Sequence, residues 1–156
     1  MDVERRLLAS TVGLALVAVV HGALTWGPAA TARFVVIAVA AAFVAEVAVI
    51  RPGLLEHHTG PQLVGVPLAA LAGWIGSIYV AYRVAALAVD PTVAPLLAGV
   101  LATAMDVLTD PPYVEAGAWS YPPARVSEPR YRGVPWWNFA GWFVLTAAVS
   151  WAATPA

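Results

Sequence analysis

Three acidic residues in or beside apolar stretches are the side chains best suited to chemistry. Glu46 lies within the apolar stretch 32–50, Asp106 lies within 91–109, and Asp110 follows at the end of that stretch. Residues four apart share a helix face, and two carboxyl groups held close together in an apolar site cannot both ionise at low cost. We therefore expect one Asp to stay protonated at neutral pH, the state that a general acid needs.

Each acid also has a simpler explanation. Glu46 precedes Arg51 by about one helical turn, and an ion pair near the lipid headgroups would satisfy it. Asp110 precedes two prolines, and Asp and Pro both favour helix ends and turns. Asp106 is harder to explain as a structural residue, because no arginine lies within four residues of it. An ionisable group within a membrane span is a functional candidate by default.

Aromatic residues are concentrated in the last part of the chain. An interfacial aromatic belt of a membrane protein would account for many of them. Alternatively, they form a site that holds an extended apolar ligand and stabilises a carbocation by cation–π attraction. The residues are Trp119, Tyr121, Tyr131, Trp136, Trp137, Phe139 and Trp142.

Several kinds of site are excluded or disfavoured. The chain has no cysteine, and all eight basic residues are arginine, which excludes thiolate chemistry, Cys-ligated metals and Schiff bases. His57 and His58 are adjacent and so do not share a helix face, and His21 is expected to be an interior histidine. No glycine-rich nucleotide motif occurs. We expect no metal and no cofactor.

The composition indicates a membrane protein. Of the 156 residues, 61% are hydrophobic and 11% are charged, whereas a soluble domain carries about 25% charged residues. This excludes an ordinary soluble enzyme and a disordered chain. The net charge of −1 and the absence of a basic run exclude an electrostatic nucleic-acid binder. The expected partner is the lipid bilayer, with no nucleic acid.

The apolar stretches predict an all-α, polytopic membrane helix bundle that forms a single domain over residues 1–156. A membrane span needs about 20 mainly apolar residues. A polar loop is expected over 110–136, and we identify no internal repeat. The five expected spans are 7–26, 32–50, 63–84, 91–109 and 137–153.

The arginines predict the topology, because cytoplasmic loops are enriched in basic residues. With five spans, one side holds Arg5, Arg6, Arg51, Arg125, Arg130 and Arg132, and the other side holds Arg33 and Arg83. The N-terminus and the long loop are therefore expected in the cytoplasm, in a multi-pass protein of the cell membrane. The second and fourth spans then run towards the cytoplasm. Glu46, Asp106, Asp110 and Asn138 are expected to converge at one depth.

Two blocks of sequence carry a resemblance to a known family. The first comprises "AMDVLTDPPYVEAGAWSY" (104–121) and "YRGVPWWNFAGW" (131–142), and the second is "GPQLVGVPLAALAGW" (60–74). Together they resemble the carotenoid biosynthesis membrane family that includes the carotenoid 1,2-hydratases, among them bisanhydrobacterioruberin hydratase. The chain is identified as a short, divergent member.

The resemblance implies a hydratase that adds water to the terminal isopropylidene double bond of an acyclic carotenoid or another polyprenoid. Asp106 or Asp110 would donate the proton, Glu46 or the partner Asp would take up the excess proton, and Asn138 would orient the water or a carboxylate. No cofactor is implied. The expected substrate-binding residues are Trp119, Tyr131, Pro135, Trp136, Phe139 and Trp142.

Other functions remain open from the sequence. A non-catalytic carotenoid-binding or assembly subunit would keep the aromatic groove without needing Asp106. A membrane prenyltransferase would use Asp106 and Asp110 to bind Mg²⁺ and pyrophosphate, although it needs more acidic ligands than one pair. A small transporter is disfavoured, because no inverted repeat is visible. A membrane-protein partner or a homo-oligomer is compatible with the enzyme and with the binding subunit.

Overall fold

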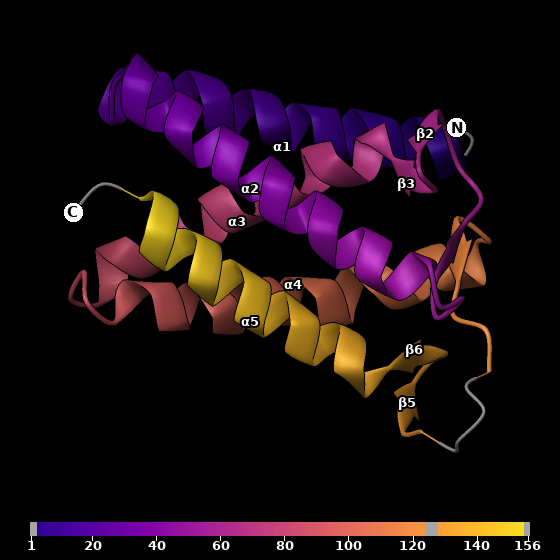
Figure 1. The fold of residues 1–156 in the computed structure, drawn as a ribbon. Coiled ribbons are helices and arrows are strands. Elements are labelled where there is room, and N and C mark those ends of the chain that lie inside the picture. The colour runs from indigo at the N-terminus through magenta and orange to yellow at the C-terminus, as the bar shows by residue number, and fades with distance from the viewer. Residues whose placement is uncertain (1–2, 124–127, 155–156) are drawn as a thin grey trace.

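The computed structural model describes residues 3–123 and 128–154, and Arg125 of the topology argument lies outside them. The described chain forms a bundle of helices with short strands, which confirms the predicted all-α membrane bundle (Figure 1). The helices α1, α2 and α3 are long and apolar enough to cross a membrane. The helices are α1 (Val3–Thr25), α2 (Pro28–Ile50), α3 (Leu68–Ala88), α4 (Ala94–Glu115) and α5 (Trp136–Ala153).

The helices pack through rows of small residues. Helix α1 packs along α3, α3 along α4, and α4 along α5, while α2 contacts α1, α3 and α5. Small side chains let helices approach closely within a membrane. The closest approach is at Gly76 of α3, which lies against the backbone of Leu14 in α1. The N-terminus and the strands of residues 62–67 and 130–135 lie at one end of the bundle, and the C-terminus lies at the other (Figure 1).

Among the helix boundaries that differ from the predicted ones, two lie next to the hairpins and the polar loop. The third helix begins at Leu68 rather than near 63, because residues 62–67 form a hairpin instead of the first turn. Helix α4 continues to Glu115 through Pro111 and Pro112, where we predicted a loop from 110. Pro111 is fully buried, and tertiary packing of this kind overrides the low helix propensity of proline.

The strands form three two-residue antiparallel pairs. Strand β1 (Glu56–His57) pairs with β4 (Trp119–Ser120). Strands β2 (Gln62–Leu63) and β3 (Val66–Pro67) form one hairpin, and β5 (Arg130–Tyr131) and β6 (Val134–Pro135) form another.

Both hairpins turn in the same way. The central turn residues Val64 and Gly65 have φ angles of 54° and 83°, and Arg132 and Gly133 have 48° and 89°. Two successive positive φ angles are typical of the tight turn that matches the twist of a two-stranded hairpin, and a glycine adopts such an angle without strain. Each hairpin leads directly into a long helix, β3 into α3 and β6 into α5.

The prediction of no internal repeat was wrong. The segments 61–74 and 129–142 share the pattern Pro-x-x-x-Gly-Val-Pro-x-x-x-x-Ala-Gly-Trp and form the same hairpin followed by a helix. The backbone N–H that begins each helix donates to the carbonyl of the first proline, from Leu68 to Pro61 at 3.0 Å and from Trp136 to Pro129 at 3.1 Å. The shared glycines and prolines set the backbone, while the intervening side chains have diverged, which hides the repeat in the sequence.

The repeat extends to the helices that precede the hairpins. In α2 every fourth residue from Phe34 to Glu46 is buried, and in α4 every fourth residue from Ala98 to Asp110 is buried, so each row ends in an acid. The strands that follow, β1 and β4, pair with each other. Helices α2 and α4 run in the same direction (Figure 1). The two units, α2–β1–β2–β3–α3 and α4–β4–β5–β6–α5, are thus parallel rather than inverted repeats around a shared centre.

The contact between α1 and α3 should be intolerant of added volume. We expect Gly76→Ala to lower the free energy of unfolding by about 1–3 kcal/mol, because overpacking a close contact forces the helices apart. The new methyl carbon would lie 2.4 Å from Leu14 Cβ and 2.7 Å from the Leu14 carbonyl carbon. The measurement is the melting midpoint of the detergent-solubilised chain by circular dichroism.

The matched control is Gly13→Ala in α1. A methyl group there meets nothing within 4 Å, and alanine favours a helix over glycine, so its midpoint should equal or exceed that of the wild type. Equal midpoints for the two variants would contradict the close approach at Gly76.

Candidate active site

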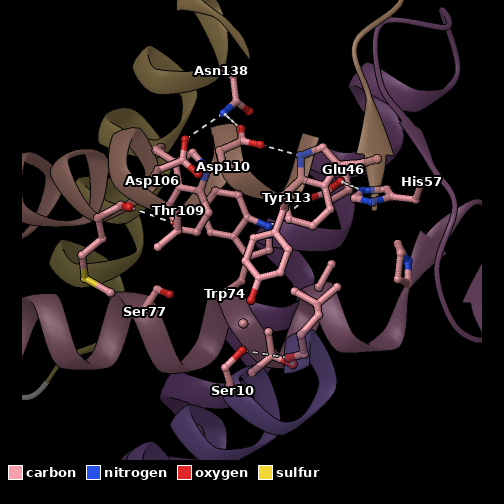
Figure 2. Close-up of a pocket in the computed structure, with 18 of the residues that line it drawn as sticks. Ser10, Glu46, His57, Trp74, Ser77, Asp106, Thr109, Asp110, Tyr113 and Asn138 are labelled. Atoms are coloured by element: carbon pink, nitrogen blue, oxygen red, sulfur yellow. Dashed lines mark hydrogen bonds and ion pairs between the residues drawn. The ribbon is translucent and has the colours of Figure 1, made fainter. Parts of the chain in front are cut away.

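A cavity of about 250 Å³ lies at the end of the bundle that carries the hairpins. Its lining includes apolar side chains, among them Leu7 and Leu14 of α1 and Ala102 and Met105 of α4. The acids, the amide and the aromatic side chains drawn in Figure 2 form its polar wall. A single cavity therefore presents an apolar surface and a small set of polar groups, as a ligand site does.

Asp106, Asp110 and Asn138 form the centre of the polar wall. Asn138 Nδ2 donates to Asp106 Oδ2 at 2.8 Å and to Asp110 Oδ2 at 2.9 Å (Figure 2). The two Asp side chains lie one turn apart on α4, and Asn138 lies in the first turn of α5. Asp106 and Asp110 are only 6% and 2% exposed. One amide thus joins two buried carboxyl groups across the α4–α5 interface.

The two carboxyl groups receive unequal numbers of donors. Asp110 also accepts from Trp119 Nε1 at its Oδ1 and from the Tyr121 hydroxyl at its Oδ2, the latter at 2.7 Å. Burial and the neighbouring Asp110 carboxylate raise the pKa of the Tyr121 hydroxyl, so this hydroxyl stays a donor. Among the described residues, Asn138 is the one donor to Asp106. Three donors stabilise the ionised form of Asp110, and Asp106 has less such support.

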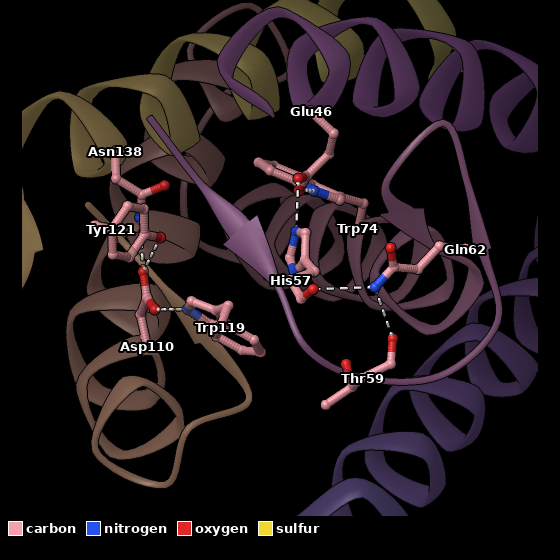
Figure 3. A network of polar contacts seen from close by, with 9 residues as sticks. All are labelled: Glu46, His57, Thr59, Gln62, Trp74, Asp110, Trp119, Tyr121 and Asn138. Carbon is pink, nitrogen blue, oxygen red and sulfur yellow. Dashed lines mark hydrogen bonds and ion pairs between the residues drawn. The ribbon is translucent and has the colours of Figure 1, made fainter. Parts of the chain in front are cut away.

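Glu46 lies beside this pair but takes different partners. Its Oε1 accepts from Trp74 Nε1 at 2.9 Å, and its Oε2 lies 3.0 Å from His57 Nε2 (Figure 3). Both side chains of the Glu46–His57 pair are nearly buried, with exposures of 10% and 6%. Glu46 therefore pairs with Trp74 and His57 rather than with Arg51, and its side chain lines the cavity.

Stacked tryptophans hold the two repeats together at the cavity. Trp74 and Trp142 occupy the same position of the two repeats, and their rings stack at 3.6 Å between centroids with an interplanar angle of 17°. Such a pair contributes about 0.5–1.5 kcal/mol beyond its buried area. Both rings also line a second cavity of about 200 Å³ between α2 and α5. The stack is thus a shared wall of two cavities.

Arg130 fixes the segment that carries Tyr121. Its guanidinium donates to the carbonyls of Tyr121 at 2.7 Å and Pro122 at 2.8 Å and pairs with Glu128. Glu128 in turn accepts from Trp137 Nε1 at 2.9 Å. In the sequence analysis Arg130 was used only to predict the topology. In the structure it positions Tyr121, which donates to Asp110.

The structure brings the four predicted catalytic residues together, since Glu46, Asp106, Asp110 and Asn138 all line the cavity. It separates the six predicted substrate-binding residues. Trp119 and Trp142 line the cavity. Pro135 and Phe139 are buried at the start of α5, and Tyr131 and Trp136 are 44% and 61% exposed.

Several cavity residues were missed by the sequence analysis. His57 was considered only as a metal ligand beside His58, and Trp74 and Tyr113 were not considered as site residues. His57 reaches the cavity because β1 pairs with β4, with His57 opposite Trp119. No periodic pattern predicts a two-residue strand pair. The repeated Ala-Gly-Trp ending was the available signal for Trp74, because its counterpart Trp142 had been selected.

The site does not have the features of a metal centre. Within residues 3–123 and 128–154, no group of three or more His, Cys, Asp or Glu side chains is arranged to hold a metal ion. The oxygens of Asp110 accept from an indole, a phenol and an amide. These donors stabilise the charge of the Asp110 carboxylate without a cation.

One of three comparisons with known proteins gives a match. A family model described as "Carotenoid biosynthesis protein" matches residues 6–156. The comparisons with curated proteins and with solved structures give no match. The matched range takes in both repeats and every residue of the cavity.

The bridging amide should stabilise the fold as well as the site. We expect Asn138→Leu, which keeps the volume but removes the donor, to destabilise the chain by about 1–3 kcal/mol for each carboxyl left without its bond. The measurement is the melting midpoint in detergent.

Thr109→Val is the matched control on α4. The Thr109 hydroxyl donates only to the Met105 carbonyl within its own helix, so its removal should change stability by less than about 0.5 kcal/mol. If Asn138→Leu had the same melting midpoint as this control, the hydrogen bonds of Asn138 would not stabilise the fold.

Proposed function

Because the chain belongs to the carotenoid biosynthesis protein family, we propose that it is a hydratase. It adds water to the terminal isopropylidene double bond of an acyclic carotenoid or related polyprenoid, by acid catalysis in the cavity between its two repeats. The observation that carries the proposal is the unequal pair Asp106–Asp110, two buried carboxyl groups joined by one amide in a cavity that apolar side chains also line.

Asp106 is the proton donor in this proposal. Asp110 is the ionised partner, since three donors stabilise its charge. Two charges one helical turn apart in an apolar site would repel each other strongly, so Asp106 keeps its proton. The hydrogen bonds thereby distinguish two residues that the sequence alone leaves equivalent.

The size of the cavity supports a chain end as the bound group. A dry cavity of about 150 Å³ holds one benzene molecule. About 250 Å³ is therefore enough for the branched end of a polyprenoid together with a water molecule, but not for a whole carotenoid. The rest of the polyene extends out of the cavity among the helices and the lipid.

The reaction follows from these positions. Asp106 transfers its proton to the carbon next to the dimethyl terminus, and the tertiary carbocation that results lies near the rings of Trp119, Trp74 and Trp142. Electron-rich ring faces stabilise a cation within about 6 Å of their centroids. Water then adds to the cation, and the excess proton passes to a base in the cavity. The protein contributes positioning, exclusion of bulk water and proton transfer.

We also propose the topology expected from the arginines, a multi-pass cell-membrane protein with its N-terminus in the cytoplasm and with α4 and α5 crossing as well. The cavity then lies at the cytoplasmic interface, where a lipid-dissolved alkene and water both reach it. The whole chain acts as a single domain, alone or with a second copy or a membrane-protein partner.

The activity is tested in a bacterial host that makes acyclic carotenoids. Expression of the chain should yield a pigment heavier by one water molecule, detected by chromatography with mass detection. Asp106→Asn removes the transferable proton and should lower the yield by about 100-fold or more, as loss of a general acid does. Asp90→Asn is the matched control, because Asp90 is exposed between α3 and α4 and bonds only to Thr92.

Three results would contradict the hydratase. Absence of the hydrated pigment, with the chain present in the membrane, would exclude a hydratase that works alone. An acyclic pigment that copurifies unaltered with both the wild type and Asp106→Asn would indicate a carotenoid-binding subunit. Dependence of a new product on added Mg²⁺ and a prenyl pyrophosphate would indicate a prenyltransferase.

The topology is tested with reporter fusions at the C-terminus. A periplasmic reporter such as alkaline phosphatase should be active there, and a fluorescent protein that folds only in the cytoplasm should be dark. The opposite result would place the C-terminus in the cytoplasm and contradict this topology.

A further inference from the structure

His57 stands out among the cavity residues because the mechanism above gives it no role. It lines the cavity, its side chain is only 6% exposed, and its Nδ1 is buried without a hydrogen-bond partner among the described residues. Buried polar atoms are nearly always paired, so an exception needs an explanation. The hydroxyl of Thr59, which lines the same cavity, is the other cavity atom in this condition.

The hydrogen bond to Glu46 determines which nitrogen of His57 is available. A carboxylate oxygen only accepts, so His57 Nε2 carries the hydrogen that it donates to Glu46 Oε2 across 3.0 Å (Figure 3). In the neutral ring Nδ1 then has a free lone pair. A carboxylate that holds an imidazole in this way orients it and stabilises the imidazolium formed when the ring accepts a proton.

The other candidate bases are already occupied. Both oxygens of Asp110 accept hydrogen bonds, and both oxygens of Glu46 do as well. A proton arriving at either carboxylate would neutralise the charge that these hydrogen bonds stabilise and so weaken them. His57 Nδ1 has no hydrogen-bond partner among the described residues.

The strand pair links this base to Asp110, the partner of the acid, through Trp119. His57 pairs with Trp119 in the β1–β4 register, their rings lie 5.8 Å apart, and Trp119 bonds to Asp110. The first repeat therefore supplies His57 and Glu46, and the second supplies Asp106 and its partners. The same scaffold, used twice, carries different polar groups on its two sides.

We propose that His57 is the catalytic base that takes the proton from the attacking water, with Glu46 as the positioning residue that holds its ring. This inference rests on the proposed hydration and goes beyond it by assigning the base to a histidine of the first repeat.

The step balances without any further reagent. The π electrons of the double bond form the new C–H bond with the Asp106 proton, and the dimethyl carbon becomes the cation. The oxygen of water forms the C–O bond, and His57 Nδ1 receives the proton that this oxygen loses. The imidazolium then returns a proton to the Asp106 carboxylate through the cavity, so the net change is the addition of one water molecule.

The first test compares His57→Gln with His58→Gln in membranes that contain the full chain and an acyclic carotenoid. Glutamine retains a donor for Glu46 but cannot act as a base at neutral pH. We expect hydration to fall about 100-fold in His57→Gln and to stay within threefold of the wild type in His58→Gln. His58 is the matched control, because its Nε2 pairs with the Ser120 hydroxyl outside the cavity.

The second readout separates loss of the base from loss of the site. In D2O the variant without a base should still form the cation with Asp106, and the cation should revert to alkene by returning a proton to that carboxylate. The recovered alkene of His57→Gln should therefore carry deuterium at the vinylic carbon. Asp106→Asn should produce neither deuterated alkene nor hydrated pigment.

Glu46→Gln tests the same assignment with the histidine in place. The carboxamide can keep its oxygen on Trp74 and present its NH2 to His57 Nε2, which moves the ring hydrogen onto Nδ1 and removes the base. We expect about the same loss of hydration as in His57→Gln, again with deuterium exchange retained. This variant carries the test if His57→Gln fails to accumulate in the membrane.

Two outcomes would overturn the assignment. Hydration by His57→Gln within threefold of the wild type would show that the base lies elsewhere. Loss of deuterium exchange together with hydration in both His57→Gln and Glu46→Gln, at normal protein levels, would show that the pair is needed before the cation forms. A wild type that forms no hydrated pigment would instead refute the proposed function, and the assignment of the base would fall with it.

Discussion

The burial of carboxyl groups inside an apolar helix bundle is the constraint on which the arrangement of the cavity depends. A charge taken out of water is costly unless donors replace the solvent. Each acid here accepts hydrogen bonds from specific side chains. Asn138 donates to both Asp106 and Asp110, Trp119 and Tyr121 donate to Asp110, and Trp74 and His57 donate to Glu46. Strands β1 and β4 and the residue after β4 deliver His57, Trp119 and Tyr121, while α3 and α5 deliver Trp74 and Asn138.

The internal repeat explains how so short a chain builds this arrangement. Each unit contributes a helix that ends its buried row in an acid, a strand, a hairpin with two positive φ angles and a second helix. The two units share the glycine turns of their hairpins and the tryptophans Trp74 and Trp142. The stacking of these two rings joins one unit to the other. Positions that face the cavity are free to differ, as in Ala70 and Asn138, which occupy the same place in the two hairpin–helix units and both line the cavity.

The divergence of the two units has a chemical consequence. The second unit surrounds its acid with donors and pairs it with another acid, while the first unit joins its acid to a histidine. An acid and a base that reach one cavity are what the proposed addition of water across a double bond requires. Arg130 donates to the Tyr121 and Pro122 carbonyls and so ties the segment that carries Tyr121 to strand β5.

The sequence by itself determined that the chain is a membrane protein, where its helices lie and which acids line the cavity. Hydrophobicity acts over some 20 neighbouring residues, so the segments could be found without knowing what they pack against, and Asp106 could be recognised because it breaks such a segment. The resemblance carried by Asp106 to Trp142 also lies in contiguous blocks. By contrast, the tertiary structure decided where α4 ends beyond its prolines. It also decided that His57 reaches the cavity and that Asp106 and Asp110 have different hydrogen-bond partners. Each depends on a partner distant in the chain, such as Trp119 for His57 or Asn138 for Asp106. Packing of the two repeats creates those partnerships, and no local pattern of residues encodes them.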